Sequence, residues 1–249
     1  MDRFSDRVAL VTGSTSGIGE ATARQLASEG ATVVINSISS VAVGDKVVAE
    51  LTDTGATASY VQCDISDPDQ CRSMVETVIE RYGKLDVLVN NAGVTKVIPH
   101  PDLDAVTPEV FHEIFDVNVF GTFELTRLAL PHLKATGDGA VVTVTSIAGI
   151  RPTGSSIPYA ASKAALNHLT RLLAHVSGPE VRINAVAPGL VRTPWTKDWG
   201  PVHEMVAERA PLGRSAEPED IATVIADVAA ARYMTGEVVL VDGGLSLWG

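Results

Sequence analysis

Short apolar segments alternate with helical segments along this 249-residue chain. The apolar segments are rich in β-branched residues, whereas the segments between them repeat their apolar residues with the period of a helix. Such alternation predicts a parallel sheet, because right-handed crossover connections place the intervening helices over both faces of the sheet. We therefore predict an α/β fold built on a doubly wound parallel sheet of about seven strands.

No linker, repeat or low-complexity tract interrupts this pattern, so we predict a single domain over residues 1–249. The pattern predicts strands at residues 8–11, 30–36, 56–64, 85–93, 139–146, 180–187 and 237–241. It predicts helices at residues 20–29, 42–53, 67–83, 107–112, 115–135, 158–176, 201–209 and 218–230.

The charge of the chain limits its partners. It carries 19 basic and 30 acidic residues, a formal net charge of -11 at pH 7, which disfavours nucleic acid and anionic membrane surfaces. The first residues resemble neither a signal peptide nor a spanning helix, so we expect a cytoplasmic protein. The two cysteines, Cys63 and Cys71, lack close metal-ligand spacing. We expect buried, unreactive thiols and no metal site.

The turn TGSTSGIG at residues 12–19 joins the first strand to the first helix. One interpretation is a tight turn, because glycine adopts backbone angles that other residues avoid. The other is a dinucleotide site, in which Gly13 permits the bend, Gly17 admits a pyrophosphate to backbone N–H groups and Gly19 allows close helix packing. The turn alone does not decide between them.

A second signal is YAASK, in which Tyr159 and Lys163 lie four residues apart and therefore on one face of a helix. A nearby ammonium favours a phenolate, so this pair predicts a tyrosine with a lowered pKa that exchanges a proton with a substrate. The alternative is a packed tyrosine beside an outward-reaching lysine. Ser146 ends an apolar strand before this helix, which brings a second hydroxyl towards the same place.

Together, TGSTSGIG, NNAG, Asn118 in NVFG, Ser146 and YAASK resemble the short-chain dehydrogenase/reductase family over essentially the whole chain. The resemblance implies a single-domain Rossmann fold, a nicotinamide dinucleotide and hydride transfer between this cofactor and a carbonyl or alcohol carbon. In general appearance the chain is most similar to the 3-oxoacyl carrier-protein reductases. A 3-oxoacyl thioester or another ketone is the implied small-molecule substrate, with steroids and sugars left open.

The resemblance also implies catalytic roles. Tyr159 is the general acid in reduction and the base in oxidation, Ser146 binds the substrate oxygen, and Lys163 lowers the pKa of Tyr159 and holds the nicotinamide ribose. Asn118 supports a proton-relay water, or alternatively satisfies backbone groups inside its helix.

The cofactor-binding residues implied by the resemblance gather in the turns that follow the strands. Asn90 has a second interpretation, as a brace within the sheet. The implied residues are Gly13, Ser14, Ser16, Gly17, Ile18, Gly19, Ser37, Ile38, Asp64, Ile65, Asn90, Ala92, Gly93, Tyr159, Lys163, Pro188, Gly189, Val191 and Thr193.

The choice between NAD and NADP depends on the residues after the second strand. An acidic residue there accepts hydrogen bonds from a ribose 2′-OH, whereas an arginine pairs with a 2′-phosphate. This chain has Ser37 and Ile38 instead, and Ser16 in the glycine turn is not basic. Because Ser37 and Ser39 are able to donate hydrogen bonds and no acid repels a phosphate, we expect a slight preference for NADP.

Residues 194–212 directly follow PGLVRT and resemble the family's variable substrate lid, in which Trp195, Trp199 and Met205 line an apolar pocket or belong to the core. Docking of an acidic carrier protein would require a basic patch, for which Arg151 and Arg192 are the candidates. The family resemblance further implies a homo-oligomer, a dimer or tetramer, paired through helices 115–135 and 158–176. The alternative function is a catalytically silent dinucleotide-binding sensor or regulatory protein.

Overall fold

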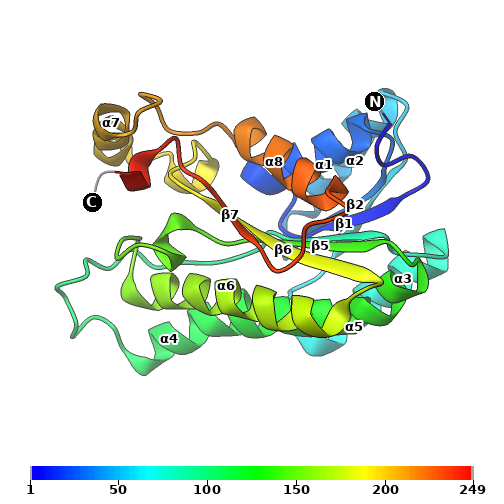
Figure 1. Ribbon diagram of the computed structural model, residues 1–249, viewed down its shortest axis with the longest axis horizontal. Coiled ribbons are helices and arrows are strands. Elements are labelled where there is room, and N and C mark those ends of the chain that lie inside the picture. Colours follow the sequence, from blue (N-terminus) through cyan, green and yellow to red (C-terminus); the bar gives the residue numbers. More distant parts are fainter. Residues whose placement is uncertain (1, 248–249) are drawn as a thin grey trace.

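The computed structural model describes residues 2–247, which form a seven-stranded, wholly parallel sheet between two layers of helices (Figure 1). This confirms the predicted fold class. The strand order is β3-β2-β1-β4-β5-β6-β7. The strands are β1 (Val8–Val11), β2 (Thr32–Ser37), β3 (Ala58–Gln62), β4 (Val87–Asn90), β5 (Gly139–Val144), β6 (Val181–Pro188) and β7 (Val238–Val241). The α-helices are α1 (Gly17–Ser28), α2 (Val41–Asp53), α3 (Pro68–Tyr82), α4 (Pro108–Phe115), α5 (Thr122–Ala135), α6 (Ile157–Ser177), α7 (Gly200–Arg209) and α8 (Pro218–Ala230).

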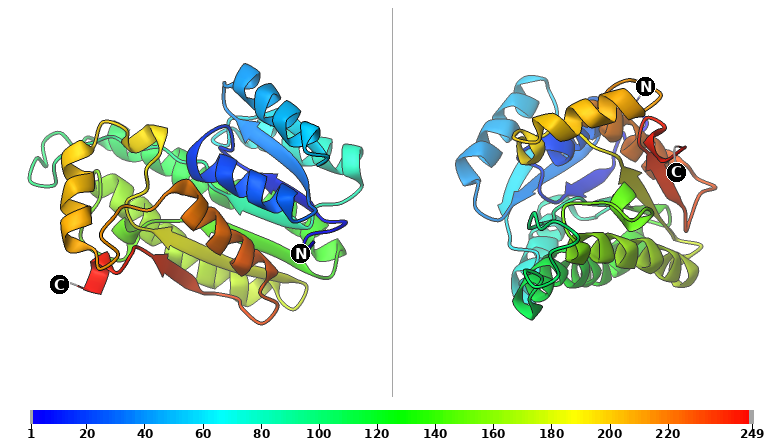
Figure 2. Two further views of the ribbon diagram at one scale, coloured as in Figure 1. Left: turned by 90° about the horizontal axis from the view of Figure 1, so that it is seen from above. Right: turned by 90° about the vertical axis from the view of Figure 1, so that its left-hand side faces the viewer.

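Both faces of the sheet are buried, as the nearly continuous apolar strands require. In β1, Ala9 and Val11 pack with residues of α1, α2 and α8 on one face. Val8 and Leu10 point to the other face and pack with residues of α3, α5 and α6. The two layers are separated by the sheet in Figure 1, and the end-on view of Figure 2 shows the twist of the sheet between them.

Helix α3 shows how local sequence sets an element's ends. The Asp67 side chain accepts hydrogen bonds from the backbone N–H groups of Asp69 (2.9 Å) and Gln70 (3.2 Å), and Pro68 occupies the first turn. Gly83 ends the helix with φ 76°. These are the start and stop signals that sequence reasoning relies on, so the predicted bounds lie within one residue of the observed ones.

The expected break between helices 107–112 and 115–135 is wrong. Helix α4 passes directly into a π-helical segment, Asp116–Gly121, which passes directly into α5. No glycine or proline lies between residues 109 and 120 to end the helix. The π-helical segment instead accommodates Asn118, whose side chain bonds to the loop after β4.

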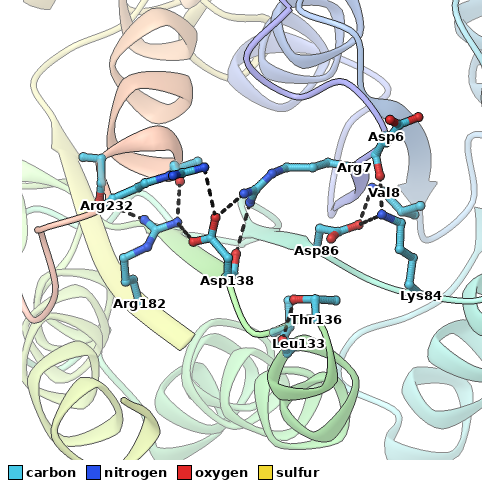
Figure 3. Close-up of polar contacts among 12 residues, drawn as sticks. Asp6, Arg7, Val8, Lys84, Asp86, Leu133, Thr136, Asp138, Arg182 and Arg232 are labelled. Atoms are coloured by element: carbon cyan, nitrogen blue, oxygen red, sulfur yellow. Dashed lines mark hydrogen bonds and ion pairs between the residues drawn. The ribbon is translucent and has the colours of Figure 1, made fainter. Parts of the chain in front are cut away.

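Asp138 holds together the edge of the sheet at which the strands begin (Figure 3). Its carboxylate pairs with Arg7 and, at 3.3 Å, with Arg182, while Arg232 lies 3.8 Å away. Arg182 also donates to the carbonyl oxygens of Ala229 (3.0 Å) and Ala231 (2.9 Å). The cluster therefore joins the starts of β1, β5 and β6 to the end of α8.

Cys63 and Cys71 are buried free thiols, as predicted. The adjacent Cys71 side chain and burial both raise the pKa of the Cys63 thiol, which keeps it protonated and weakly nucleophilic. Among the helices of residues 2–247, none combines the length and the apolarity that a membrane crossing requires.

Candidate functional site

The strand order reverses at β1 and β4, and the loops that follow these two strands open a crevice at the carboxyl edge of the sheet. Thr12 joins the loops: its Oγ1 accepts hydrogen bonds from the backbone N–H groups of Asn91 and Ala92, both at 3.0 Å. The Asn91 side chain returns hydrogen bonds to the carbonyl oxygens of Thr12 (2.9 Å) and Gly13 (3.1 Å). The crevice walls are thus held in a fixed arrangement.

The crevice continues into a cleft of about 970 Å³ that extends to helix α7. Most of the residues expected at the site lie along it. They are Gly13, Ser16, Gly17, Ile18, Ser37, Ile38, Asp64, Ile65, Ala92, Gly93, Ser146, Tyr159, Lys163, Pro188, Gly189, Val191 and Thr193.

The glycine turn forms a cradle at one end of the cleft. Gly13 and Gly17 have φ values of 60° and 56°, which side-chain-bearing residues rarely adopt. A Cβ at Gly17 would lie 3.2 Å from Cγ2 of Thr193, on the opposite wall. Ser16 precedes α1 without a side-chain cap, so the N–H groups of the first turn are not satisfied by its hydroxyl. The open backbone and the positive helix end suit the pyrophosphate of a dinucleotide.

Gly93 forms a second close approach beside the reactive side chains. A Cβ there would lie 3.1 Å from Oδ1 of Asn118 and 3.7 Å from Nζ of Lys163. Asn118 is fully buried, and its amide exchanges hydrogen bonds with both backbone groups of Val94, at 2.8 and 3.0 Å, and donates to Ser162. The side chain therefore satisfies backbone groups, in agreement with the second interpretation of Asn118, while its role beside a proton-relay water stays a prediction.

Four expected residues do not line the cleft: Ser14, Gly19, Asn90 and Asn118. Ser14 donates to the carbonyl of Val11 (2.7 Å) beneath the glycine turn. A Cβ at Gly19 would lie 2.4 Å from the Gly13 oxygen, so Gly19 packs against the turn. Asn90 is buried and donates to Oγ1 of Thr126 on α5 (2.9 Å), which is the bracing position.

Tyr159 and Ser146 meet in the cleft. Burial raises the pKa of Tyr159 to about 12, and the neighbouring Ser146 hydroxyl acts in the opposite direction. The pKa of Tyr159 is thus raised and not lowered as expected, because desolvation of the phenol is the largest contribution. Ser146 Oγ accepts a hydrogen bond from the N–H of Ala148 (3.1 Å), which leaves the hydroxyl proton of Ser146 as a donor.

Lys163 is buried beneath Tyr159, as their spacing on α6 predicts. Its Nζ lies 5.7 Å from the centre of the Tyr159 ring and donates to the carbonyl of Val144 at 3.0 Å. Burial lowers the pKa of the Lys163 ammonium to about 8. Burial of this amine at the floor of the cleft therefore lowers the stability of the folded protein. Side chains with strongly shifted pKa values are common at functional sites.

Comparison with known proteins agrees with this geometry. A family described as enoyl-(acyl carrier protein) reductase matches residues 13–246. A protein named ketoacyl reductase 2 of the granaticin polyketide synthase of Streptomyces violaceoruber is 53% identical over 96% of both chains. The 3-oxoacyl-[acyl-carrier-protein] reductase of Thermotoga maritima is 37% identical over 98% of this chain and 99% of its own. The structure of a short-chain dehydrogenase/reductase from Burkholderia xenovorans superposes with a TM-score of 0.91, at 38% identity, covering 97% of this chain and 98% of that one.

The chain belongs to the short-chain dehydrogenase/reductase family. It is therefore an oxidoreductase of a family that uses a nicotinamide cofactor.

In this short-chain dehydrogenase/reductase, the residues after β2 form a closed hydrogen-bonded corner. Ser37 Oγ lies 2.9 Å from the hydroxyl of Tyr60 and accepts from the N–H of Ser40 at 3.1 Å. The Tyr60 ring lies against Gly44 of α2, where a Cβ would come within 2.2 Å of it. The Ser37 hydroxyl is thus already engaged by β3 and by the start of α2.

Sequence reasoning missed Asn36, which the dehydrogenase/reductase uses to shape the same corner. Its Oδ1 accepts from the N–H of Gly13 (3.3 Å), and its amide donates to the carbonyls of Val61 (3.1 Å) and Cys63 (3.2 Å). An amide at the end of an otherwise apolar strand was the available signal. Asn91, in NNAG, was missed as well, although it lies between two residues that were selected.

One end of the cleft lies between the loop before α4 and the segment that carries α7, seen together at the left of Figure 1. Trp195, Trp199 and Met205 all line it, which favours the pocket over the core interpretation. Residues Val97 to His100 line the facing wall and were not anticipated individually. The N–H of Ile98 donates to the carbonyl of Ser155 (2.8 Å), which joins this loop to the approach to α6.

Proposed function

We propose that this enzyme reduces a ketone, or the 3-oxo group of an acyl thioester, with Tyr159 as the proton donor. The observation that carries the proposal is the meeting of Ser146, Tyr159 and Lys163 in the cleft that also contains the glycine turn. A nicotinamide bound along this cleft would supply the hydride.

The protein's own groups then have separate tasks. Ser146 donates its free proton to the substrate oxygen and holds that oxygen next to the phenol. Tyr159, with its pKa raised to about 12 by burial, keeps its proton at neutral pH and delivers it from Oη as negative charge develops on the substrate oxygen. In the reverse direction the same oxygen accepts the proton. The Lys163 ammonium, fixed by Val144, stabilises the phenolate that remains after proton transfer.

The coenzyme we propose is NAD or NADP, with NADP slightly preferred. No carboxylate occupies position 37, and the Ser40 side chain makes no cap hydrogen bond at the start of α2, where a 2′-phosphate would lie. The preference should be small, because Lys163 is the only lysine or arginine among the described residues that line the cleft.

For the substrate, the ketoacyl reductases of Streptomyces violaceoruber and Thermotoga maritima support an oxo group as the reacting centre. Docking of a carrier protein receives less support. Arg151 donates to the carbonyl of Ser246 (2.9 Å), and Arg192 lies 3.5 Å from the Glu217 carboxylate. Both candidate cations are therefore engaged within the chain.

We also propose a homo-oligomer in the cytoplasm. Four apolar side chains remain 39 to 63% exposed on two helices: Phe120 and Phe123 on the π-helical segment and α5, and Leu172 and Val176 on α6. Pairing of these two helices with those of a second copy would cover them. Free buried thiols suit a reducing compartment. Light scattering after size-exclusion chromatography would test the assembly.

The alternative, a catalytically silent dinucleotide sensor, has no observation in its favour, since Ser146, Tyr159 and Lys163 all line the cleft. The test is calorimetric titration of NAD(H) and NADP(H), followed by a panel of cyclic ketones, linear ketones and 3-oxoacyl thioesters. Turnover with either coenzyme supports a reductase. Coenzyme binding without turnover of any member would support the sensor, and absence of binding would contradict both.

A further inference from the structure

Trp195 lies directly beside Tyr159. The two ring centres are 6.1 Å apart and the ring planes meet at 74°, an edge-to-face contact. Trp195 is nevertheless 45% exposed, although it is the largest kind of apolar side chain and lies inside the cleft. A half-exposed indole beside the proposed proton donor is a surface that a substrate would cover.

The backbone that carries Trp195 is fixed by hydrogen bonds. Residues Pro194–Thr196 form one short 3-10 turn, in which Oγ1 of Thr196 accepts from the N–H of Thr193 (3.2 Å) and donates to the carbonyl of Val191 (2.6 Å). Nε2 of His203, on α7, lies 3.2 Å from the carbonyl oxygen of Thr196, and its Nδ1 lies 2.8 Å from the Ser215 hydroxyl. The turn is thus held between β6 and α7.

Apolar side chains from the loop before α4 and from segment 194–212 line the same cleft as Trp195. They are Val97, Ile98, Pro99, Trp199, Val202 and Met205. The charged side chains in the cleft are Asp64, Lys163 and Asp198, and Lys163 lies beneath Tyr159. Within the described residues, Lys163 is thus the only lysine or arginine that lines the cleft, and His100 the only histidine, so no second lysine or arginine is present there to pair with a phosphate or carboxylate of a substrate.

We propose that Trp195 is a specificity-determining residue that selects flat, uncharged cyclic ketones by packing its indole ring against them while Tyr159 contacts their oxygen. This inference rests on the proposed function and narrows it. A flat ring covers the exposed indole with little loss of conformational freedom, whereas a linear acyl chain must be ordered to do so.

The test compares two uncharged ketones, the bicyclic 2-tetralone and the linear 2-octanone, in three variants. Trp195→Ala removes the surface and Trp195→Phe keeps a smaller aromatic face. Tyr233→Ala is the matched control, because Tyr233 is an exposed aromatic residue that lies outside segment 194–212 and does not line the cleft. Thermal melting of each variant establishes that it is folded.

We expect Trp195→Ala to lower kcat/KM for 2-tetralone about tenfold and Trp195→Phe about threefold, as loss of an aromatic contact predicts. The kcat/KM for 2-octanone should stay within about twofold, and Tyr233→Ala should change neither value. An equal fall for both ketones in Trp195→Ala, or an unchanged value for 2-tetralone, would overturn the proposal.

A second measurement does not depend on turnover. Calorimetric titration with 2-naphthol, a flat unreactive ligand, should show weaker binding to Trp195→Ala than to the wild-type enzyme, again by about tenfold. If no ketone is reduced but this difference appears, the proposed function fails while the aromatic site stands. If ketones are reduced and 2-naphthol binds both proteins equally, the specificity role of Trp195 fails and the reductase remains.

Discussion

The ammonium nitrogen of Lys163 donates a hydrogen bond to the carbonyl oxygen of Val144, at 3.0 Å, on the floor of the cleft. This contact joins α6 to the end of β5, which also carries Ser146 two residues later. It places one cation under the phenol of Tyr159 at a position where burial opposes charge. The proposed mechanism therefore uses a buried ammonium at position 163, whereas folding stability would favour an uncharged side chain there.

Replacement of Lys163 by methionine should abolish measurable turnover and yet stabilise the coenzyme-free protein at pH 7, by about 2 kcal/mol after loss of the hydrogen bond is subtracted. The folded-state pKa of about 8 lies below that of an unfolded lysine. Between pH 8 and pH 10.5 the unfolded wild-type chain binds more protons, so wild-type stability rises with pH in this window. The advantage of the variant should shrink there.

Urea unfolding at pH 7, 8, 9 and 10 measures this difference. Lys46→Met is the control, since Lys46 is 75% exposed and its ammonium remains in water. A variant that is less stable than wild type at pH 7 would mean that the Val144 contact outweighs the burial of charge.

Replacement of Tyr159 by phenylalanine should abolish measurable turnover and leave dinucleotide affinity within a few-fold of wild type. The ring still packs against Trp195, while the proton donor is removed. In wild type, the rate of alcohol oxidation should rise with pH for as long as the protein stays folded. The reason is that the deprotonated form of Tyr159 is scarce below its pKa of about 12. Steady-state rates in both directions and calorimetry with the coenzyme check this, and full activity in the variant would remove Tyr159 from the mechanism.

Much of the sheet was predictable because its signals are local. In β1, four consecutive apolar residues before a glycine turn are sufficient to place a buried strand, and Asp67, Pro68 and Gly83 mark the ends of α3 within a few residues of their own positions. Tyr159 and Lys163 were also predictable as a pair, since one helix sets their separation.

The environment of these side chains was not predictable, because it depends on residues distant in sequence. The amide of Asn118 meets Val94, 24 positions away, and Ser37 meets Tyr60, 23 positions away. The pKa of Tyr159 was misjudged for the same reason: the nearby lysine is visible in the sequence, whereas the desolvation that outweighs it comes from the assembled cleft.

Replacement of Ser37 by aspartate should shift the coenzyme preference towards NAD by about tenfold, because a carboxylate repels a 2′-phosphate and accepts from a ribose hydroxyl. The hydrogen bonds around residue 37 should be kept, since the new carboxylate is still able to accept hydrogen bonds from the N–H of Ser40 and from the Tyr60 hydroxyl. The ratio of dissociation constants for NAD and NADP gives the answer. Ser73→Asp, on the exposed face of α3, controls for added charge, and an unchanged ratio in Ser37→Asp would mean that the 2′ position lies elsewhere.

Replacement of Asp138 by asparagine should destabilise the protein at pH 7 by about 1 to 2 kcal/mol, a range reduced for the partial exposure of the carboxylate. Although burial alone would raise its pKa, hydrogen bonding to Arg7 and the charges of Arg7 and Arg182 hold the pKa of Asp138 below its usual range. A lowered carboxyl pKa contributes stability that is present above the unfolded value, about 3.9, and is lost as pH falls through the folded value. Denaturant unfolding at several pH values should therefore show the difference between wild type and Asp138→Asn at pH 7 and a smaller one below about pH 4. As a control, Asp53→Asn, an exposed change at the end of α2, should lower the free energy of unfolding far less. A difference between wild type and Asp138→Asn that stays the same at low pH would assign the effect to packing instead of charge.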